Sequence, residues 1–221
     1  MSEIRFIPIT YELCAPVAAL LEEVFPDMPP IDQYSVEELE EMVDLFPMGT
    51  PIVLDGDRPI GMGTGIFTDL DFDNMPATEN GLLYDADDVC THDPDGDYYY
   101  GSDIAVHPDY RGRGIARKIY NWRKKQVTDN NKKGFAAAAV LPGFANHRGT
   151  LTIHEYVDKV IAKELFDPTL SVQLRNGFKV VKLLHEYFTY PRSDNWSALI
   201  LWENPNLDKP EPKRDSSCHR A

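Results

Sequence analysis

Residues 103–116 read Asp-Ile-Ala-Val-His-Pro-Asp-Tyr-Arg-Gly-Arg-Gly-Ile-Ala, and no other stretch of the chain says as much about its architecture. The apolar run up to Val106 predicts a strand, which stops at Pro108 because proline cannot continue a strand ladder. A helix is expected to start beside Gly114. The stretch therefore predicts a strand, a tight turn and a helix start in direct succession.

The turn has the composition of an anion site. Gly112 and Gly114 carry no side chains, so the backbone N–H groups of residues 112–116 can face one point in front of the helix. A helix N-terminus of this kind favours phosphate groups, and a pyrophosphate most of all. Arg111 and Arg113 add positive charge beside it. Taken alone, the two glycines fit equally well with a tight turn whose arginines are solvated.

The whole stretch also matches a known motif. Arg111, Gly114 and Ala116 satisfy the pattern Arg/Gln-x-x-Gly-x-Gly/Ala, and Ile104–Val106 supplies the strand before it. The chain thereby resembles the GNAT N-acetyltransferases, in which this pattern is the acetyl-CoA motif. The resemblance implies an α/β (α+β) fold, with a central mixed, mostly antiparallel sheet of about seven strands flanked by helices.

The resemblance also implies how the co-substrate acetyl-CoA would bind. The pantetheine arm would pair with the Ile104–Val106 backbone like an added strand, at a splay between this strand and Phe135–Leu141. A backbone N–H near Val106 would polarise the thioester carbonyl, and an acceptor amine, once neutral, would attack that carbonyl directly. The residues expected to bind acetyl-CoA are Ile104, Ala105, Val106, Arg111, Gly112, Arg113, Gly114, Ile115 and Ala116.

Two positions depart from the pattern of the family. Many GNAT enzymes carry a glutamate on the fourth or fifth strand that accepts the proton of the amine, and the corresponding strands here have none. Many also carry a tyrosine that protonates the leaving thiolate, and Gln173 stands at that position. Tyr100 is the first candidate for a catalytic role and Ser102 the second, with strand packing as the alternative for Tyr98–Tyr100. An acidic residue of the 69–97 loop could substitute.

Part of the chain resembles one branch of the family, the GNAT domains fused to carbon–nitrogen (nitrilase-type) hydrolases. The likeness rests on Leu141-Pro-Gly-Phe144, Glu155-Tyr-Val157, residues 167–178 and the segment His92-Asp-Pro-Asp-Gly-Asp-Tyr98. Because the chain ends at Ala221 without a hydrolase half, we expect a stand-alone acetyltransferase domain over residues 1–203. A flexible tail is expected over residues 204–221.

Hydrophobic spacing predicts the other elements. Strands are expected at 3–8, 51–54, 59–68, 98–106, 135–141, 178–188 and 196–202. Helices are expected from about Leu13 to Pro26, with Pro16 in the first turn, and over 35–46, 114–127, 152–165 and 170–176. In the 114–127 helix, Arg117, Arg123 and Lys124 are assigned to the polar face. Residues 69–97 hold ten acids and no lysine or arginine, which predicts a long polar loop, often a functional lid.

Charge is distributed unevenly over the 221 residues, whose net charge is −14. Residues 1–103 hold 24 acids and two bases, and residues 104–221 hold 12 acids and 20 bases, so the halves carry −22 and +8. A strongly acidic chain argues against nucleic acid as a partner. The acidic half fits either a solvated surface or a cationic acceptor, and the basic half holds the expected binding site for the polyanion CoA.

Other features set the compartment and exclude some chemistries. The N-terminus lacks the pattern of a signal peptide, and no apolar run is long enough to cross a membrane, so we expect a cytoplasmic protein without membrane contact. The three cysteines lack metal or disulfide spacing. His154-Glu155 has no second histidine four residues on, and no metal is expected.

The leading interpretation is an acyltransferase that moves an acetyl group from acetyl-CoA to a primary amine of a small molecule or peptide, with a cationic acceptor favoured by the acidic half. The alternative is a non-catalytic acyl-CoA-binding sensor or regulatory module, since the usual acid and base are missing. A homodimer is compatible with the fold, and nothing in the sequence fixes it.

Overall fold

The structure, a computed structural model, describes residues 3–26, 28, 33–87 and 90–207. In these residues the strands form two sheets flanked by helices, which confirms the expected fold class. The first sheet has the order β1-β2-β3-β6 and is antiparallel throughout. Its strands are β1 (Ile4–Pro8), β2 (Pro51–Asp55), β3 (Arg58–Gly63) and β6 (Ile104–Val106).

The second sheet has the order β4-β5-β7-β9-β8. Its strands are β4 (Ile66–Thr68), β5 (Tyr98–Tyr100), β7 (Gly134–Val140), β8 (Lys179–His185) and β9 (Trp196–Glu203). β5 and β7 are parallel, and the other neighbours are antiparallel. The sheet is therefore mixed and mostly antiparallel, as expected.

Two strands predicted as continuous are each broken in two, so the described part of the chain has more strands than expected. Residues 59–68 form β3 and β4 with a break after Gly63, and residues 98–106 form β5 and β6 with a break at 101–103. A Cβ on Gly65 would lie 2.3 Å from the Tyr99 hydroxyl, and one on Gly101 would lie 2.6 Å from the Phe135 ring. The backbone passes so close to these rings that only glycine fits.

The break separates the two sheets. The Gly101 N–H still donates to the Ala136 carbonyl of β7 at 2.9 Å, whereas β6 pairs with β3 alone among the described strands. The expected splay between residues 104–106 and 135–141 is thus confirmed.

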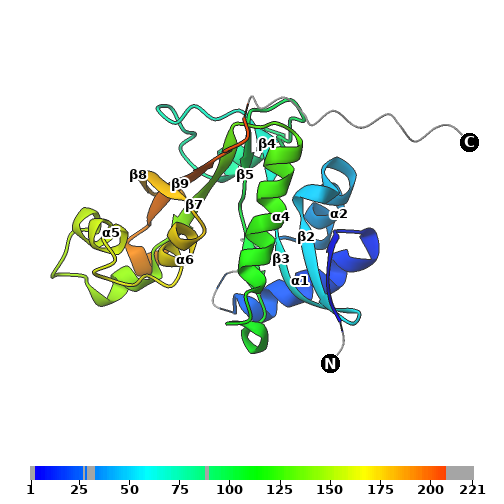
Figure 1. The fold of residues 1–221 in the computed structure, drawn as a ribbon, viewed down its shortest axis with the longest axis horizontal. Helices are drawn as coiled ribbons and strands as arrows, with labels where there is room; N and C mark the ends of the chain where they lie inside the picture. Colours follow the sequence, from blue (N-terminus) through cyan, green and yellow to red (C-terminus); the bar gives the residue numbers. More distant parts are fainter. Residues whose placement is uncertain (1–2, 27, 29–32, 88–89, 208–221) are drawn as a thin grey trace, which may run out of the picture.

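Helices cover the sheets (Figure 1), and α4 runs along the middle of the molecule between the strands of the two sheets. Ser35 and Glu38 form the capping box that opens the second helix. The helices are α1 (Tyr11–Val24), α2 (Val36–Leu45), α3 (Asn80–Leu83), α4 (Ile115–Asp129), α5 (Ile153–Ile161) and α6 (Leu170–Arg175).

Some predicted helix details are wrong. α1 begins at Tyr11, so Pro16 lies inside the helix rather than in its first turn. The carbonyl that Pro16 leaves unpaired belongs to Glu12, which is exposed to water and can be solvated. α5 ends at Ile161 rather than 165, since Lys163 adopts a φ of +64° that no helix continues.

The C-terminal segment starts out ordered. Asn204, placed in the expected flexible tail, is buried, and its amide groups donate to the carbonyls of Lys132 and Lys133. Residues 208–221 lie outside the described residues. No helix among the described residues is long and apolar enough to cross a membrane.

Candidate functional site

The turn before α4 has the geometry of an anion cradle. Gly112 and Gly114 have φ angles of +76° and +77°, which side chains strongly disfavour, and Gly114 is the N-cap of α4. A Cβ on Gly112 would meet no atom within 4 Å, so the space beside the turn is open. The amides of the first turn of α4 have no partner within the helix and point out of its N-terminus. These features fit a phosphate group.

Two arginines of the motif form hydrogen bonds to the backbone that stabilise this turn. Arg111 Nε donates to the Val106 carbonyl at 3.0 Å, and Arg113 Nη2 donates to the Asp109 carbonyl at 2.9 Å. Arg113 also stacks over the Tyr110 ring, 4.9 Å from its centre. Both arginines remain exposed, so their charge can face an anion. Of the other motif residues, Ile115 is buried in the core and Ala116 is half-buried.

One edge of β6 is free to accept another strand. The Thr64 N–H bonds to the Asp103 carbonyl and the His107 N–H bonds to the Ile60 carbonyl, so the backbone groups of alternate residues 103, 105 and 107 face β3. Those of Ile104 and Val106 consequently face the opposite side, into the splay. Ala105 lies between them, with its side chain buried among α1 and β3 residues.

Beside the break lies a carboxylate that the sequence did not single out. The Tyr100 hydroxyl donates to Glu79 Oε1 at 2.7 Å. Burial and the nearby charge of Asp103 raise the pKa of Glu79 to about 7, against the lowering effect of the Tyr100 bond. At neutral pH, therefore, Glu79 can take up a proton and also release it, as a general base must.

Asp103 is the second carboxylate at the break. Burial raises its pKa to about 6, and the guanidinium of Arg123 on α4 opposes that shift. Arg123 is only 1% exposed and donates to the Asp103 carbonyl, so its assignment to the polar face of α4 is wrong. The charge of this arginine is directed toward the strand break.

The two predicted catalytic residues have different surroundings. Tyr100 is fully buried, and burial, followed by the adjacent Glu79 charge, raises the pKa of its hydroxyl. The Ser102 hydroxyl instead bridges Tyr34 and Thr64, with both oxygen–oxygen distances at 2.8 Å. Thr64 also accepts the Asp103 N–H at 3.0 Å. The break is thus lined by a chain of hydroxyl groups and by the Tyr100–Glu79 pair.

Tyr187, from the segment between β8 and β9, completes the surroundings of Glu79. Its carbonyl accepts the Glu79 N–H at 2.9 Å, which fixes the glutamate backbone. Its hydroxyl is buried close to the hydroxyl of Tyr100, and burial raises its pKa. Glu79 is therefore surrounded by buried tyrosine hydroxyls.

The candidate site therefore gathers residues from six separate segments, represented by Tyr34, Thr64, Glu79, residues 100–103, Arg123 and Tyr187. The sequence identified Tyr100 and Ser102 and allowed for an acid from the 69–97 loop, but it missed Tyr34, Asp103 and Arg123 and did not name Glu79. One signal was available, because Glu79 is the only glutamate among the ten acids of residues 69–97 and stands just before the apolar Leu82 and Leu83.

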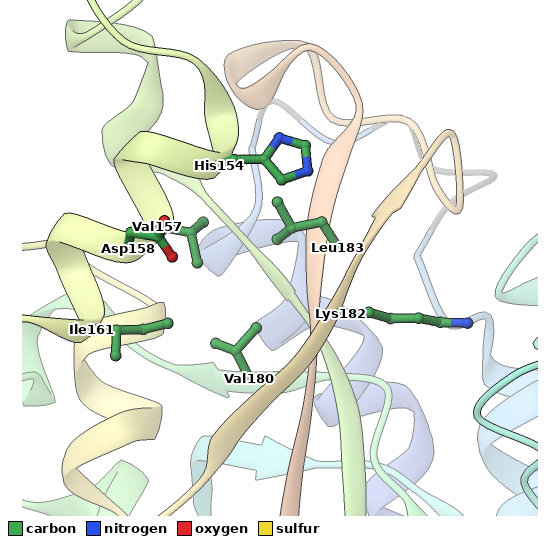
Figure 2. Close-up of a pocket in the computed structure, with 7 residues that line it drawn as sticks. All are labelled: His154, Val157, Asp158, Ile161, Val180, Lys182 and Leu183. Carbon is green, nitrogen blue, oxygen red and sulfur yellow. The ribbon is translucent and has the colours of Figure 1, made fainter.

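A groove of about 530 Å³ lies elsewhere, between α5 and β8. Figure 2 shows Val157 and Ile161 of α5 facing Val180 and Leu183 of β8, with Lys182 pointing away to the other side of the strand. The groove contains none of the residues around Glu79. Among the described residues, no group of three or more His, Cys, Asp or Glu side chains could hold a metal ion.

Comparison with known proteins identifies the family of this chain. The model of the acetyltransferase (GNAT) family matches residues 17–148, which is more than half of the chain and contains β2 to β7, α4 and the cradle. The chain therefore belongs to the GNAT acetyltransferase family.

Individual relatives share a little over a quarter of their aligned residues with this chain. The uncharacterized N-acetyltransferase YkwB of Bacillus subtilis strain 168 is 28% identical over 194 residues, covering 84% of this chain and 82% of YkwB. The probable hydrolase YhcX of the same strain is 27% identical over 197 residues, covering 88% of this chain and only 37% of YhcX. The solved GphF GNAT-like decarboxylase, in complex with isobutyryl-CoA, superposes with a TM-score of 0.74 at 16% identity, covering 90% of this chain and 99% of that one.

Proposed function

We propose that this protein transfers an acetyl group from acetyl-CoA to a primary amine, with Glu79 as the general base. The observation that carries the proposal is the free edge of β6, which runs from Glu79 and the strand break at one end to the cradle of α4 at the other. A linear molecule with a pyrophosphate at one end and a thioester at the other would suit this arrangement. YkwB, an N-acetyltransferase by name, supports the transfer reaction, and GphF, a GNAT-like decarboxylase solved with isobutyryl-CoA, supports only the binding of an acyl-CoA by this fold.

The binding residues follow from the geometry. The amides of residues 112–116, with Arg111 and Arg113, would hold the pyrophosphate at the N-terminus of α4. The amide and carbonyl of Ile104 and the amide of Val106 would pair with the pantetheine arm, as in strand addition, while the Val106 carbonyl accepts from Arg111. One of these amides would donate to the thioester oxygen and stabilise the negative charge that develops there.

The chemistry needs a proton acceptor for the amine. Glu79 would take one proton from the ammonium group of the acceptor, directly or through water, and leave a neutral nitrogen with a free electron pair. The nitrogen attacks the thioester carbon, the carbon–sulfur bond breaks and CoA leaves as a thiolate. The nitrogen then loses its second proton and the thiolate takes one, so the products are the amide, CoA and one released proton.

We also propose that the acceptor is cationic beyond its reacting amine, as a polyamine, an aminoglycoside or a lysine-bearing peptide would be. The support is the charge of the segment that carries Glu79. Among its described residues, Asp85, Asp87, Asp93 and Asp95 are exposed, and the segment has no lysine or arginine. A surface of one sign raises the local concentration of an oppositely charged substrate.

The test is a CoA-release assay over a panel of polyamines, aminoglycosides, lysine peptides and uncharged amines. We expect release with a subset of the cationic amines, and a lower rate when the four aspartates become asparagine. Calorimetric titration with acetyl-CoA is run in parallel. Binding without release across the whole panel would identify a non-catalytic acyl-CoA-binding module, and absence of binding would refute the proposal altogether.

A further inference from the structure

Arg123 is the most deeply buried cation of the described residues, and it lies where the two sheets part. It comes from the third turn of α4, and its side chain is 1% exposed. Burying a guanidinium is costly unless its charge and its donors are matched. Here its Nε has no hydrogen-bond partner among the described residues, so the match is incomplete. Such a group calls for an explanation beyond stability.

Two glycines make room for the guanidinium. A Cβ on Gly63, the last residue of β3, would lie 2.3 Å from Nη2 of Arg123 and 2.6 Å from Cζ. A Cβ on Gly101, the first residue of the break between β5 and β6, would lie 3.0 Å from Nη1. The guanidinium therefore lies against the backbone at two interruptions, one between β3 and β4 and the other between β5 and β6. On its other side, the Phe135 ring of β7 is centred 5.7 Å from Cζ.

The contacts of the guanidinium are with the segment that leads into the site. Nη2 donates to the Asp103 carbonyl, which also accepts the Thr64 N–H. Its charge acts on the Asp103 carboxylate and on the hydroxyl groups of Tyr99 and Tyr120. One end of the break is thus tied to α4, the helix whose N-terminus forms the cradle.

We propose that Arg123 is a positioning residue that fixes the 101–103 break, so that the free edge of β6 keeps its place between the cradle of α4 and Glu79. This role rests on the proposed function, and it belongs to a residue that would touch neither acetyl-CoA nor the acceptor. Without the guanidinium, the Asp103 carbonyl loses a donor, and the gap opposite Gly63 and Gly101 allows residues 101–104 to shift. A shift of about 1 Å at a reacting centre can cost about 100-fold in rate.

The experiment compares Arg123→Met and Arg123→Lys with the wild type. Lys125→Met, an exposed residue on the same helix, is the matched control. We expect Arg123→Met to lower kcat about 100-fold and to raise the KM for acetyl-CoA, while the KM for the acceptor stays unchanged. Arg123→Lys, which keeps the charge without the planar fork, should recover part of kcat. A merely structural defect would lower kcat through the active fraction and leave both KM values unchanged.

A second variant covers the case in which Arg123→Met does not fold. Gly63→Ala places a methyl group against the flexible end of Arg123, so it should displace the guanidinium while the charge and the fold are retained. We expect faster hydrogen exchange in a peptide spanning residues 98–106 and the same kinetic changes in weaker form. Wild-type exchange and kinetics in folded Arg123→Met, or in Gly63→Ala if the first is unfolded, would overturn the inference. Hydrogen exchange tests whether Arg123 fixes residues 101–103 even if the protein acetylates no amine. A failure of the proposed function is therefore distinguished from a failure of this inference.

Discussion

The hydroxyl of Tyr100 donates a hydrogen bond of 2.7 Å to Oε1 of Glu79, across 21 positions of sequence. One partner belongs to a buried strand and the other to the acidic segment before it. The bond holds the carboxylate next to the end of the free β6 edge, and the surroundings raise the pKa of Glu79 to about 7.

Replacing Glu79 by Gln should abolish most turnover without unfolding the protein. The amide has the same shape and cannot accept a proton, and general base catalysis contributes about 100-fold or more. The rate of CoA release with the best amine should therefore fall by at least about 100-fold. Asp73→Asn, an exposed change in the same segment, serves as the control and should keep wild-type activity. Full activity of Glu79→Gln would exclude Glu79 as the base.

Replacing Tyr100 by Phe should shift the pH dependence of the reaction. The hydroxyl stabilises the ionised form of Glu79, so its removal raises the pKa of Glu79 above about 7. Because the base works in its ionised form, the rising limb of the pH–rate profile should move to higher pH. The plateau should also begin at higher pH. Tyr98→Phe on the same strand should leave the limb in place. An unmoved limb in Tyr100→Phe would argue that another group is the base.

The stability of the protein should fall as the pH rises through about 7. The pKa of Glu79 is raised from 4.5 to about 7 in the folded chain, so folding favours the neutral carboxyl. The resulting stabilisation is fully present below the pKa that Glu79 has in the unfolded chain. It declines as the pH rises and is lost above the pKa that Glu79 has in the folded chain. Asp103 adds a similar decline through about 6.

Urea unfolding at pH 5 and pH 8 measures this decline. The free energy of unfolding of Glu79→Gln should depend less on pH than that of the wild type, because glutamine does not titrate. If the unfolding free energies of the two proteins change equally between pH 5 and pH 8, Glu79 has an ordinary pKa in the folded state.

A change at Ser102 should affect stability more than catalysis. Its hydroxyl bridges Tyr34 and Thr64, so Ser102→Ala leaves both groups short of a partner and should cost about 1 kcal/mol of unfolding free energy. We expect kcat to stay within about tenfold of the wild type, since the Tyr100–Glu79 bond is untouched. The double variant Ser102→Ala/Thr64→Val should cost less than the two single changes together, since it removes the same bond only once. A kcat loss of about 100-fold would restore Ser102 as a catalytic residue.

Reversing the charge of Arg111 should weaken acetyl-CoA binding specifically. Arg111→Glu places a negative charge beside the expected pyrophosphate and removes the donor to the Val106 carbonyl. The dissociation constant from calorimetric titration should rise at least about tenfold, equivalent to about 1.4 kcal/mol, and should depend less on salt. Arg192→Glu, exposed and far along the chain, is the charge-matched control. Equal weakening of acetyl-CoA binding in the two variants would indicate that the overall charge of the protein, rather than a specific site at Arg111, governs binding.

The sequence was most informative where conformation is decided locally. Pro108, Gly112 and Gly114 restrict the backbone within a few residues, so the strand, turn and helix start of 103–116 could be predicted together with the splay implied by the resemblance. The strand breaks could not, because they depend on Tyr99 and Phe135 lying against Gly65 and Gly101, a contact made only in the folded chain.

Other residues of the candidate site could not be predicted for the same reason. Glu79 is one acid among ten in a segment without periodicity, and only the fold brings it to Tyr100. Arg123 was assigned to solvent because arginine is polar, although the Asp103 carbonyl that receives it lies 20 positions away. In both cases the decisive contact joins residues about 20 positions apart in the sequence.

The division of the strands into two sheets has a consequence for how the molecule opens. Only residues 101–103 link β5 to β6, while β6 is bonded to β3 and β5 to β7. Sheets that share few hydrogen bonds can unfold as separate cooperative units. A chain-like substrate bonded along β6 and lying against β7 would join these units, so we expect the protein to open in one step when loaded and in two when empty.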